Sequence, residues 1–333
     1  MKKTRLAIAG ATGNVGREII RLIEERQLLE NSPILLASSV SEGEYLPFEE
    51  SDLQVKSLKD FDYKGIDAII FATPKEVSEV YVPKAQEAGV KVIDLSSHLR
   101  ANNNVSLYFD GLSKDVTKRT ETVVIPSVPS LQMAKVLAEL AAIGVVATGV
   151  VSTVMCPVSM SSRDAMEELF AQSASLLGGA GAEEAIPENF NMQIGYNVIP
   201  QVGDFKGAHT DAEIAMIMET NRALTQPVPL MATFVYVPTF VGISQSVTLD
   251  VNAGFELKKV REMLEKSETL RLIDNPEKGE YSTPFGTAET DAIYISRLRE
   301  DMLSQGKLQF WMTGDNIRLA ALSSLNAVSK MMQ

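Results

Sequence analysis

The sequence contains one cysteine, one tryptophan and two histidines among its 333 residues. The single thiol, Cys156, has no second cysteine with which to form an intrachain disulfide, which favours a reducing compartment. His98 and His209 lie far from Cys156 and from each other in the sequence, so no metal-ligand spacing is present. We therefore expect no disulfide framework and no bound metal.

Clusters of basic residues and long apolar runs are also missing. The formal net charge is −12, and groupings such as Lys118-Arg119 are too small to neutralise the phosphates of a nucleic acid. No run approaches the roughly 18 apolar residues that would span a bilayer. The apolar stretch behind the basic N-terminus, residues 6–11, is interrupted by a glycine-rich turn, which favours a strand over a signal peptide. We expect a cytoplasmic protein with neither nucleic-acid nor membrane partners.

The first part of the chain alternates short apolar strands with helical segments. Apolar residues make up 45% and charged residues 22% of the sequence, as in ordinary globular proteins, and the length predicts two domains. Strands are predicted at residues 6–9, 34–38, 66–72, 90–95 and 123–125, with helices at residues 15–23 and 77–88. This order predicts a parallel sheet with helices on both faces.

The pattern changes after about residue 126. Helices are predicted at residues 131–142, 165–177 and 316–332, strands at 145–155, 233–237, 246–251 and 308–312, and a loop at 178–181. The predicted fold is α/β: a doubly wound, Rossmann-type dinucleotide-binding domain formed by residues 1–126 and 313–333, with an inserted α+β domain formed by residues 127–312.

A glycine-rich turn separates the first predicted strand from the first helix. Gly10, Gly13 and Gly16 have the spacing GxxGxxG. Glycines at such positions allow a tight turn, a close approach of the backbone to a pyrophosphate and close packing of helix on strand. The start of the helix also offers N–H groups and the positive end of a dipole to phosphates. We expect a dinucleotide-binding site, although tight βα turns also use glycine for packing alone.

The second strand bears on the choice of dinucleotide. Ser38, at its end, is placed to bond a ribose, whereas Glu42 would repel a 2′-phosphate and no arginine or lysine is nearby to bind one. NAD is therefore favoured over NADP. The residues expected to contact the dinucleotide are Gly10, Thr12, Gly13, Asn14, Val15, Ser38, Ala72, Thr73 and Asn316.

Several separated motifs together resemble the aspartate-semialdehyde dehydrogenase family along nearly the whole chain. They are residues 10–16 (GATGNVG), 94–100 (DLSSHLR), 219–221 (ETN), Val237-Pro238 with Gly242, and 315–318 (DNIR). The resemblance implies an oxidoreductase of amino-acid biosynthesis that uses NAD or NADP and forms a homodimer through its second domain. Predicted strands 233–237 and 246–251 suit a sheet-based dimer interface.

The residues that would perform the family's chemistry are mostly replaced. The resemblance implies a catalytic cysteine at the start of a helix, and the matching position is Val128. The position of its general acid–base histidine is Ile243, and that of its carboxylate-binding arginine is Tyr236. The family's lysine corresponds to Ala215, and its glutamine falls near Met155 or Cys156. Arg100, which the resemblance assigns to the phosphate substrate, is kept.

Two residues are candidates for catalysis by a different chemistry. Cys156 follows an apolar strand near the implied cleft and is either a relocated nucleophile or a small buried hydrophobic residue. His98 lies two residues before Arg100 and is either an acid–base group or an ordinary loop residue. Ser127 and Ser130 are better explained as turn and helix-cap residues.

Three functions follow from these observations. The first is a non-catalytic family member, or pseudoenzyme, that keeps the fold and the dinucleotide site. The second is a diverged NAD(P)-dependent oxidoreductase that acts on an aldehyde or oxo group through Cys156 or His98. The third is a dimeric binding or scaffold protein.

Overall fold

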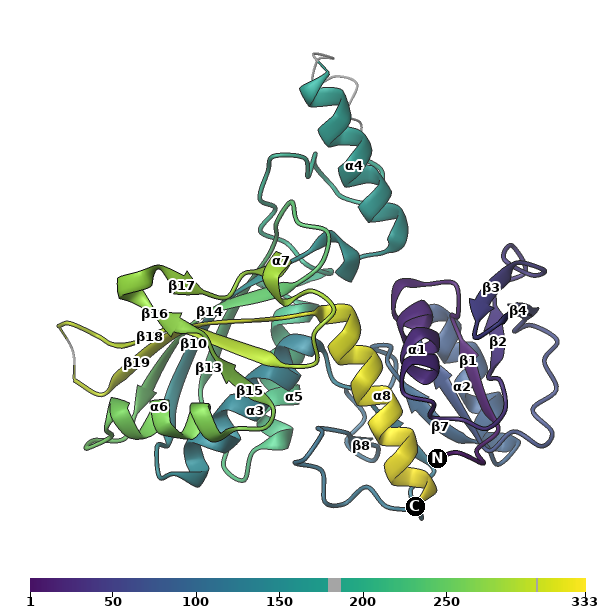
Figure 1. Cartoon of the computed structure of the whole chain (residues 1–333), viewed down its shortest axis with the longest axis horizontal. Coiled ribbons are helices and arrows are strands. Elements are labelled where there is room, and N and C mark those ends of the chain that lie inside the picture. Colours follow the sequence, from purple (N-terminus) through teal and green to yellow (C-terminus); the bar gives the residue numbers. More distant parts are fainter. Residues whose placement is uncertain (179–186, 304) are drawn as a thin grey trace. The chain divides into compact units, whose positions relative to one another are not determined.

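A computed structural model describes residues 1–178, 187–303 and 305–333, and the chain forms two compact units (Figure 1). Unit 1 comprises residues 1–127 and 320–333, and unit 2 comprises residues 128–319.

Unit 1 contains a seven-stranded parallel sheet in the order β5-β2-β1-β6-β7-β9-β8. Its strands are β1 (Leu6–Ala9), β2 (Ile34–Ala37), β5 (Lys56–Ser57), β6 (Ala68–Phe71), β7 (Lys91–Asp94), β8 (Ser106–Leu107) and β9 (Thr122–Val124). Every residue of β1 and β6 is buried, as expected for central strands covered on both faces. The predicted parallel sheet is confirmed.

Helices α1 (Asn14–Glu25) and α2 (Lys75–Glu87) supply the predicted crossovers. The buried residues of α1 include Ile19, Leu22 and Ile23, whose spacing gave the sequence signal. On α2, Val82 and Ala85 pack in one cluster with residues of β1 and β6. A short antiparallel hairpin, β3 (Tyr45–Phe48) with β4 (Ser51–Gln54), follows β2 and was not expected from the sequence.

Unit 2 is built on a six-stranded mixed sheet in the order β13-β10-β14-β19-β18-β15. Its strands are β10 (Ala147–Cys156), β13 (Leu230–Tyr236), β14 (Ile243–Val251), β15 (Leu270–Leu272), β18 (Ile293–Glu300) and β19 (Lys307–Gly314). The pairs β10–β13 and β15–β18 are parallel and the other pairs are antiparallel. The mixed sheet agrees with the expectation of a second, α+β domain.

The two faces of this sheet differ in burial. Alternate residues of β14 and β19, such as Val247, Leu249 and Phe310, are buried on the face that carries the helices. The opposite face, which we call the open face, contains Val151 at 47% exposure and Met231 at 66%, paired with each other across β10 and β13. A sheet face with exposed apolar side chains is a candidate contact surface.

The remaining elements of unit 2 surround the sheet. They are α3 (Val128–Ala142), α4 (Arg163–Leu177), α5 (Asp211–Ala223), α6 (Leu257–Lys266), α7 (Pro284–Thr287), the 3-10 helices Val158–Met160 and Pro276–Lys278, and the short strands β11 (Phe205–Lys206), β12 (His209–Thr210), β16 (Asp274–Asn275) and β17 (Glu280–Tyr281). The final helix α8 (Asn316–Met332) begins in unit 2 and continues into unit 1.

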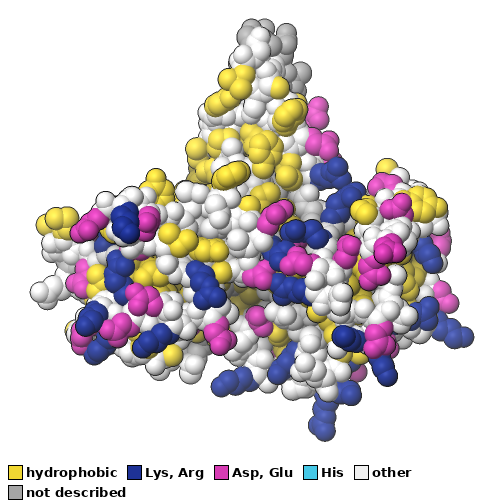
Figure 2. Space-filling model, in the orientation of Figure 1, with side chains coloured by type: hydrophobic (Ala, Val, Ile, Leu, Met, Phe, Trp, Pro, Cys, Tyr) yellow, Lys and Arg dark blue, Asp and Glu magenta, His cyan; other side chains and the backbone are white. Residues whose placement is uncertain are grey.

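Helix α4 projects from the mixed sheet of unit 2 and has its own small core (Figure 1). Ala165 and Leu169 pack against Val158 and Ile194 at its base. Its other side exposes Phe170, and apolar side chains gather over this region (Figure 2). The loop predicted at residues 178–181 lies beyond Gly178 outside the described residues.

Two kinds of feature are absent from the described residues. No helix among them has the length and apolar character needed to cross a membrane. Nor do three or more histidine, cysteine, aspartate or glutamate residues come together in this part of the chain in a way that would hold a metal ion.

Candidate functional site

The glycine-rich turn lies at the carboxyl end of β1, in the middle of the parallel sheet of unit 1. Gly10 has φ +82°, and a Cβ built on it would lie 2.1 Å from the carbonyl oxygen of Ala72. A Cβ on Gly16 would lie 2.1 Å from the carbonyl oxygen of Gly10. These two glycines are therefore required by the turn itself.

Gly13 has a different environment. It is the N-cap of α1, has an ordinary φ of −76°, and a Cβ on it would meet only the Gly10 carbonyl oxygen at 3.4 Å. Since glycine has no side chain, it cannot cap the N–H groups at the start of α1. The Arg17 Nε donates to the Thr12 carbonyl oxygen at 2.9 Å, which fixes the outer part of the turn. This half-buried helix start has the features of a phosphate cradle.

A chain of hydrogen bonds connects the ends of β6 and β7 beside this turn. The Thr73 and Ser78 hydroxyls are 2.8 Å apart, and Ser78 donates to Asp94 Oδ1 at 3.2 Å. The Ser96 N–H and hydroxyl both donate to the Asp94 carboxyl at 3.0 Å. Burial raises the pKa of Asp94 above its ordinary value, although these hydrogen bonds and the charge of Arg100 oppose the shift. Sequence reasoning assigned this carboxyl no role.

The other residues predicted to contact the dinucleotide lie at the same edge or in unit 2. Ala72 and Thr73 follow β6 and are half-buried, and Ser38 and Glu42 follow β2 and are exposed. Asn316 lies in unit 2, where its Oδ1 accepts from the Gly242 N–H at 2.9 Å and its Nδ2 donates to the Ser159 hydroxyl at 3.1 Å. The side chain of Asn316 therefore stabilises unit 2, and its contact with a dinucleotide stays a prediction.

His98 and Arg100 lie in the loop after β7. His98 Nδ1 is 3.7 Å from the Glu79 carboxylate, and the imidazole is 22% exposed. The Arg100 guanidinium donates to the Leu95 carbonyl oxygen at 2.6 Å. His98 thus has an acidic neighbour, as a surface loop histidine often does.

In unit 2, the positions that the resemblance assigned to catalysis lie at one edge of the mixed sheet. Strand register pairs Cys156 with Tyr236 at the ends of β10 and β13, and β14 begins beside them at Ile243. The first turn of α3, which starts at Val128, is tied to β14 by the bond from Gln245 Nε2 to the Pro129 carbonyl oxygen at 3.1 Å. Four separate stretches of sequence thus meet at this edge.

The side chains that meet there are neutral. Val128 is 8% exposed and Ile243 is fully buried. Tyr236 packs edge to face with Phe190, with ring centroids 5.0 Å apart. Alkyl and phenol groups in these places offer neither a thiolate nor an imidazole. Ala215, at the position implied for a lysine, is half-buried on α5.

Cys156 is in the interior rather than in a cleft. It is fully buried, and burial raises the pKa of its thiol far above the ordinary value. Burial likewise raises the pKa of the neighbouring Tyr236 phenol. Because the thiolate is the nucleophilic form, these surroundings argue against covalent chemistry at Cys156 and favour its reading as a small hydrophobic residue.

A buried hydrogen-bond network lies beneath this edge and was missed by sequence reasoning. Gln245 Nε2 donates to Gln132 Oε1 at 2.9 Å, and the Ser152 hydroxyl donates to Gln245 Oε1 at 3.1 Å. Gln132 Nε2 is buried with no partner among the described residues. One signal was present: Gln245 is the polar member of an otherwise apolar series, Ile243, Val247 and Leu249, at alternate positions of β14.

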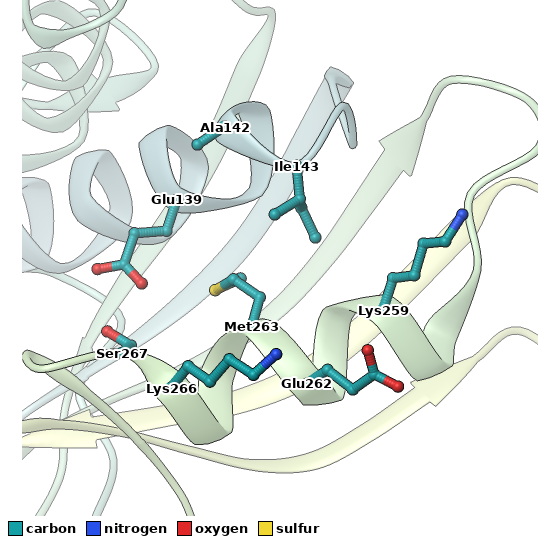
Figure 3. Close-up of a pocket in the computed structure, with 8 residues that line it drawn as sticks. All are labelled: Glu139, Ala142, Ile143, Lys259, Glu262, Met263, Lys266 and Ser267. Carbon is teal, nitrogen blue, oxygen red and sulfur yellow. The ribbon is translucent and has the colours of Figure 1, made fainter.

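An open groove lies elsewhere in unit 2, between the end of α3 and helix α6 (Figure 3). It has a volume of about 500 Å³, and its lining includes Ile143, Met263 and Lys266. None of the residues singled out by the sequence lines it. Neither Val128 nor Ile243 lines this groove.

Comparison with known proteins gives matches along the whole chain. The semialdehyde dehydrogenase NAD binding domain matches residues 5–139, and the semialdehyde dehydrogenase dimerisation domain matches residues 137–319. The aspartate-semialdehyde dehydrogenase of Rickettsia conorii is 33% identical over 333 residues, covering 98% of this chain and 96% of its own. That of Aquifex aeolicus is 30% identical, covering 98% and 97%.

Solved structures of similar proteins share the fold. Aspartate semialdehyde dehydrogenase II from Vibrio cholerae, complexed with ASA, has a TM-score of 0.91 at 27% identity, covering 99% of this chain and 98% of that one. A probable aspartate-semialdehyde dehydrogenase from Pseudomonas aeruginosa has a TM-score of 0.92 at 27% identity, covering 100% and 99%.

Proposed function

The chain belongs to the semialdehyde dehydrogenase family, and we propose that it keeps the family's dinucleotide-binding and dimeric framework without the family's dehydrogenase reaction. The observation that carries this proposal is an alkyl side chain at each of two positions, Val128 at the start of α3 and Ile243 at the start of β14. The hydrogen bond from Gln245 to Pro129 ties these two elements together.

The covalent step of the family's reaction requires two groups. A thiolate must attack the aldehyde carbon and a proton carrier must serve it, since these groups act as a unit. Loss of one member of such a unit typically costs about 10⁴- to 10⁶-fold in rate. Val128 and Ile243 remove both, and Tyr236 replaces the arginine that the resemblance assigns to the substrate carboxylate. The parent reaction is expected to be lost.

An activity assay tests this part. The relatives are named aspartate-semialdehyde dehydrogenases, so the full chain is assayed with aspartate semialdehyde, phosphate and NAD or NADP, beside an active relative. We expect no turnover above the protein-free rate. Turnover within tenfold of the relative, lost in a Gly13→Ala variant, would show that catalysis survives.

The dinucleotide is proposed to bind at the edge of the parallel sheet, with its pyrophosphate at the start of α1. The positive φ of Gly10 and the uncapped Gly13 support this placement. Ser38 is proposed to bond the ribose, and Glu42 to favour NAD over NADP. When bound, the dinucleotide would supply a hydride acceptor or donor. The turn would position it and offer it the backbone N–H groups at the start of α1.

Gly13 offers a test that separates binding from folding. Its backbone is compatible with alanine, so Gly13→Ala should leave the melting temperature of the unliganded protein within about 2 °C. A methyl group there would obstruct the pyrophosphate. A saturating dinucleotide, at 100 times its dissociation constant, should add about 2.7 kcal/mol to the wild type and little to the variant. If neither NAD nor NADP stabilises the wild type, the scaffold function becomes the better explanation.

The homodimer is proposed to form through the open face of unit 2. The match to a dimerisation domain supports the assembly, and exposed Val151 and Met231 support the choice of surface.

The diverged oxidoreductase has less support. Its covalent form requires a reactive Cys156, and that thiol is fully buried. Its acid–base form requires His98 to act on a substrate, and the imidazole lies 3.7 Å from the Glu79 carboxylate. Both residues stay candidates of lower rank.

A further inference from the structure

The Thr73 hydroxyl lies beside the glycine-rich turn and is connected through Ser78 to Asp94, in a series of hydrogen bonds that we call the relay. A Cβ built on Gly10 would lie 3.2 Å from Thr73 Cγ2, so the Thr73 side chain adjoins the turn. Thr73 is half-buried, whereas Ser78 and Asp94 are fully buried. Of these three side chains, Thr73 is the one that a ligand can reach.

The buried end of the relay fixes the direction of its hydrogen bonds. Asp94 Oδ1 accepts from the Ser96 backbone N–H at 3.0 Å, and a backbone N–H can only donate. Asp94 Oδ2 accepts from the Ser96 hydroxyl at 3.0 Å, and that hydroxyl in turn accepts from the His98 N–H at 3.1 Å. Both carboxyl oxygens of Asp94 are therefore acceptors.

Ser78 passes this direction on to Thr73. The Ser78 hydroxyl donates to Asp94 Oδ1 at 3.2 Å, and its oxygen lies 2.8 Å from Thr73 Oγ1. A hydroxyl has one hydrogen to donate and two lone pairs that accept. Because the hydrogen of Ser78 is directed at Asp94, Ser78 can only accept from Thr73. The hydrogen of Thr73 is then directed at Ser78, and Thr73 Oγ1 offers a ligand lone pairs alone.

Strand order decides which part of a dinucleotide would meet Thr73. Strands β2 and β6 flank β1 on opposite sides, so Ser38, after β2, and Thr73, after β6, lie on opposite sides of the turn. A dinucleotide has one ribose on each side of its pyrophosphate. If the pyrophosphate lies at the start of α1 and Ser38 bonds the ribose of adenosine, Thr73 adjoins the ribose of nicotinamide.

We propose that Asp94 is a positioning residue that acts through Ser78 to make Thr73 an acceptor for a hydroxyl of the nicotinamide ribose. This inference rests on the dinucleotide site proposed above and names the group that Thr73 recognises there. A ribose hydroxyl can donate to Thr73, whereas phosphate oxygens only accept. The relay therefore favours the ribose at Thr73 and leaves the pyrophosphate to the N–H groups at the start of α1.

The ribose contact is tested by calorimetric titration of the full chain with NAD and with two analogues that lack the 2′- or the 3′-hydroxyl of the nicotinamide ribose. Thr73→Val should weaken NAD binding about fivefold and leave the binding of one analogue unchanged. Thr73→Ser keeps the hydroxyl and should bind NAD nearly as the wild type does. Thr122→Val is the matched control, because the Thr122 hydroxyl accepts from Gln86 at the amino end of β9.

The relay is tested by further variants in the same titrations. Ser78→Ala leaves the hydrogen of Thr73 undirected and should weaken NAD binding about threefold, with no further loss when it is added to Thr73→Val. Asp94→Asn keeps an acceptor for Ser78 and should retain the affinity, whereas Asp94→Leu should lower it as Ser78→Ala does. If Asp94→Leu fails to fold, Ser78→Ala carries this test, and Thr73→Ala replaces Thr73→Val on the same ground.

Neutron diffraction from unliganded crystals in D₂O measures the direction of the relay without a dinucleotide. We expect the Thr73 deuterium to point at Ser78 and the Ser78 deuterium at Asp94, and the opposite direction for either would overturn the proposal. If the wild type binds neither NAD nor NADP, the proposed dinucleotide site and the ribose contact both fail. If NAD binds and Thr73→Val weakens NAD and both analogues equally, or none of them, only the ribose contact fails.

Discussion

The side-chain amide of Gln245 on β14 donates to the side-chain carbonyl of Gln132 on α3 across 2.9 Å, with both side chains fully buried. This bond joins the helix that begins at Val128 to the strand that begins at Ile243. The two positions implied for nucleophile and base are therefore held together by a neutral amide pair.

Gln245→Leu should destabilise unit 2 by roughly 3 kcal/mol. The change removes a donor to Gln132 Oε1 and to the Pro129 carbonyl oxygen, and an acceptor for Ser152. Each buried polar group left without a partner costs about 1–3 kcal/mol. Urea unfolding followed by tryptophan emission measures the loss, because Trp311 lies in the same unit.

The Gln132–Gln245 pair also permits a double-mutant cycle. Gln132→Leu with Gln245→Leu should cost less than the sum of the two single changes, because the double variant leaves neither amide without the other. Exposed Gln54→Leu should change the unfolding free energy by less than about 0.5 kcal/mol. Strict additivity of the two buried changes would contradict the network.

Much of the framework was predictable because its signals are local. The strand at Leu6–Ala9, the turn at Gly10 and the helix at Asn14–Glu25 follow from apolar periodicity and glycine spacing. The hairpin at β3 and β4 was missed because only Leu46 and Phe48 of β3 are buried, and polar residues flank them. Strand β18 was missed because its bulge at Arg297 interrupts the alternation of apolar residues.

The site was less predictable than the framework because its residues come from separate stretches of the chain. Gln132 and Gln245 are far apart in sequence, and only the fold shows that they meet. For Cys156 the sequence left two interpretations, a relocated nucleophile and a small buried hydrophobic residue. The burial of the residue favours the second. The positions of Val128 and Ile243 were marked by resemblance, since an alkyl group by itself gives no functional signal.

Cys156 should be unreactive in the folded protein. Its thiol is fully buried and burial raises its pKa, so the thiolate is scarce and inaccessible. Ellman's reagent at pH 8 should label less than a tenth of the chains within an hour in buffer and one thiol per chain in 6 M guanidinium chloride. A Val128→Cys variant serves as the comparison. Rapid labelling of the native wild type that is lost in Cys156→Val would support covalent catalysis through Cys156.

The same burial predicts weaker stability at alkaline pH. The folded-state pKa of Cys156 lies above its unfolded value, so its neutral thiol contributes stability that is fully present below about pH 8 and declines as pH rises past the unfolded value near 9. The slope from one such group is about 1.4 kcal/mol per pH unit. Cys156→Val should flatten the decline in unfolding free energy between pH 9 and 10. Equal slopes for variant and wild type would mean that the thiol is not buried.

Val151→Arg should convert the proposed homodimer into monomers. Val151 is 47% exposed on the open face, opposite Met231, and a charge placed at the centre of an apolar interface would lose its hydration without a partner. Size-exclusion chromatography with light scattering gives the mass. Val80→Arg, at a valine of α2 in unit 1 that is 51% exposed, should leave the mass unchanged. A dimer that persists in Val151→Arg would place the interface on another surface.

Glu42→Gln should raise the affinity for NADP while leaving that for NAD nearly unchanged. Glu42 is exposed in the segment after β2, which also contains Ser38, the residue proposed to bond the ribose. Its carboxylate would repel a 2′-phosphate, and an exposed charge within a Debye length contributes about 1 kcal/mol or less. We therefore expect about a threefold gain in affinity for NADP in calorimetric titrations at low salt, and a smaller gain at 0.5 M salt.

Glu50→Gln, in the turn of the β3–β4 hairpin, is the control for net charge. If Glu50→Gln gives the same gain, the preference comes from overall charge; if neither variant binds NADP better, the preference for NAD does not come from Glu42.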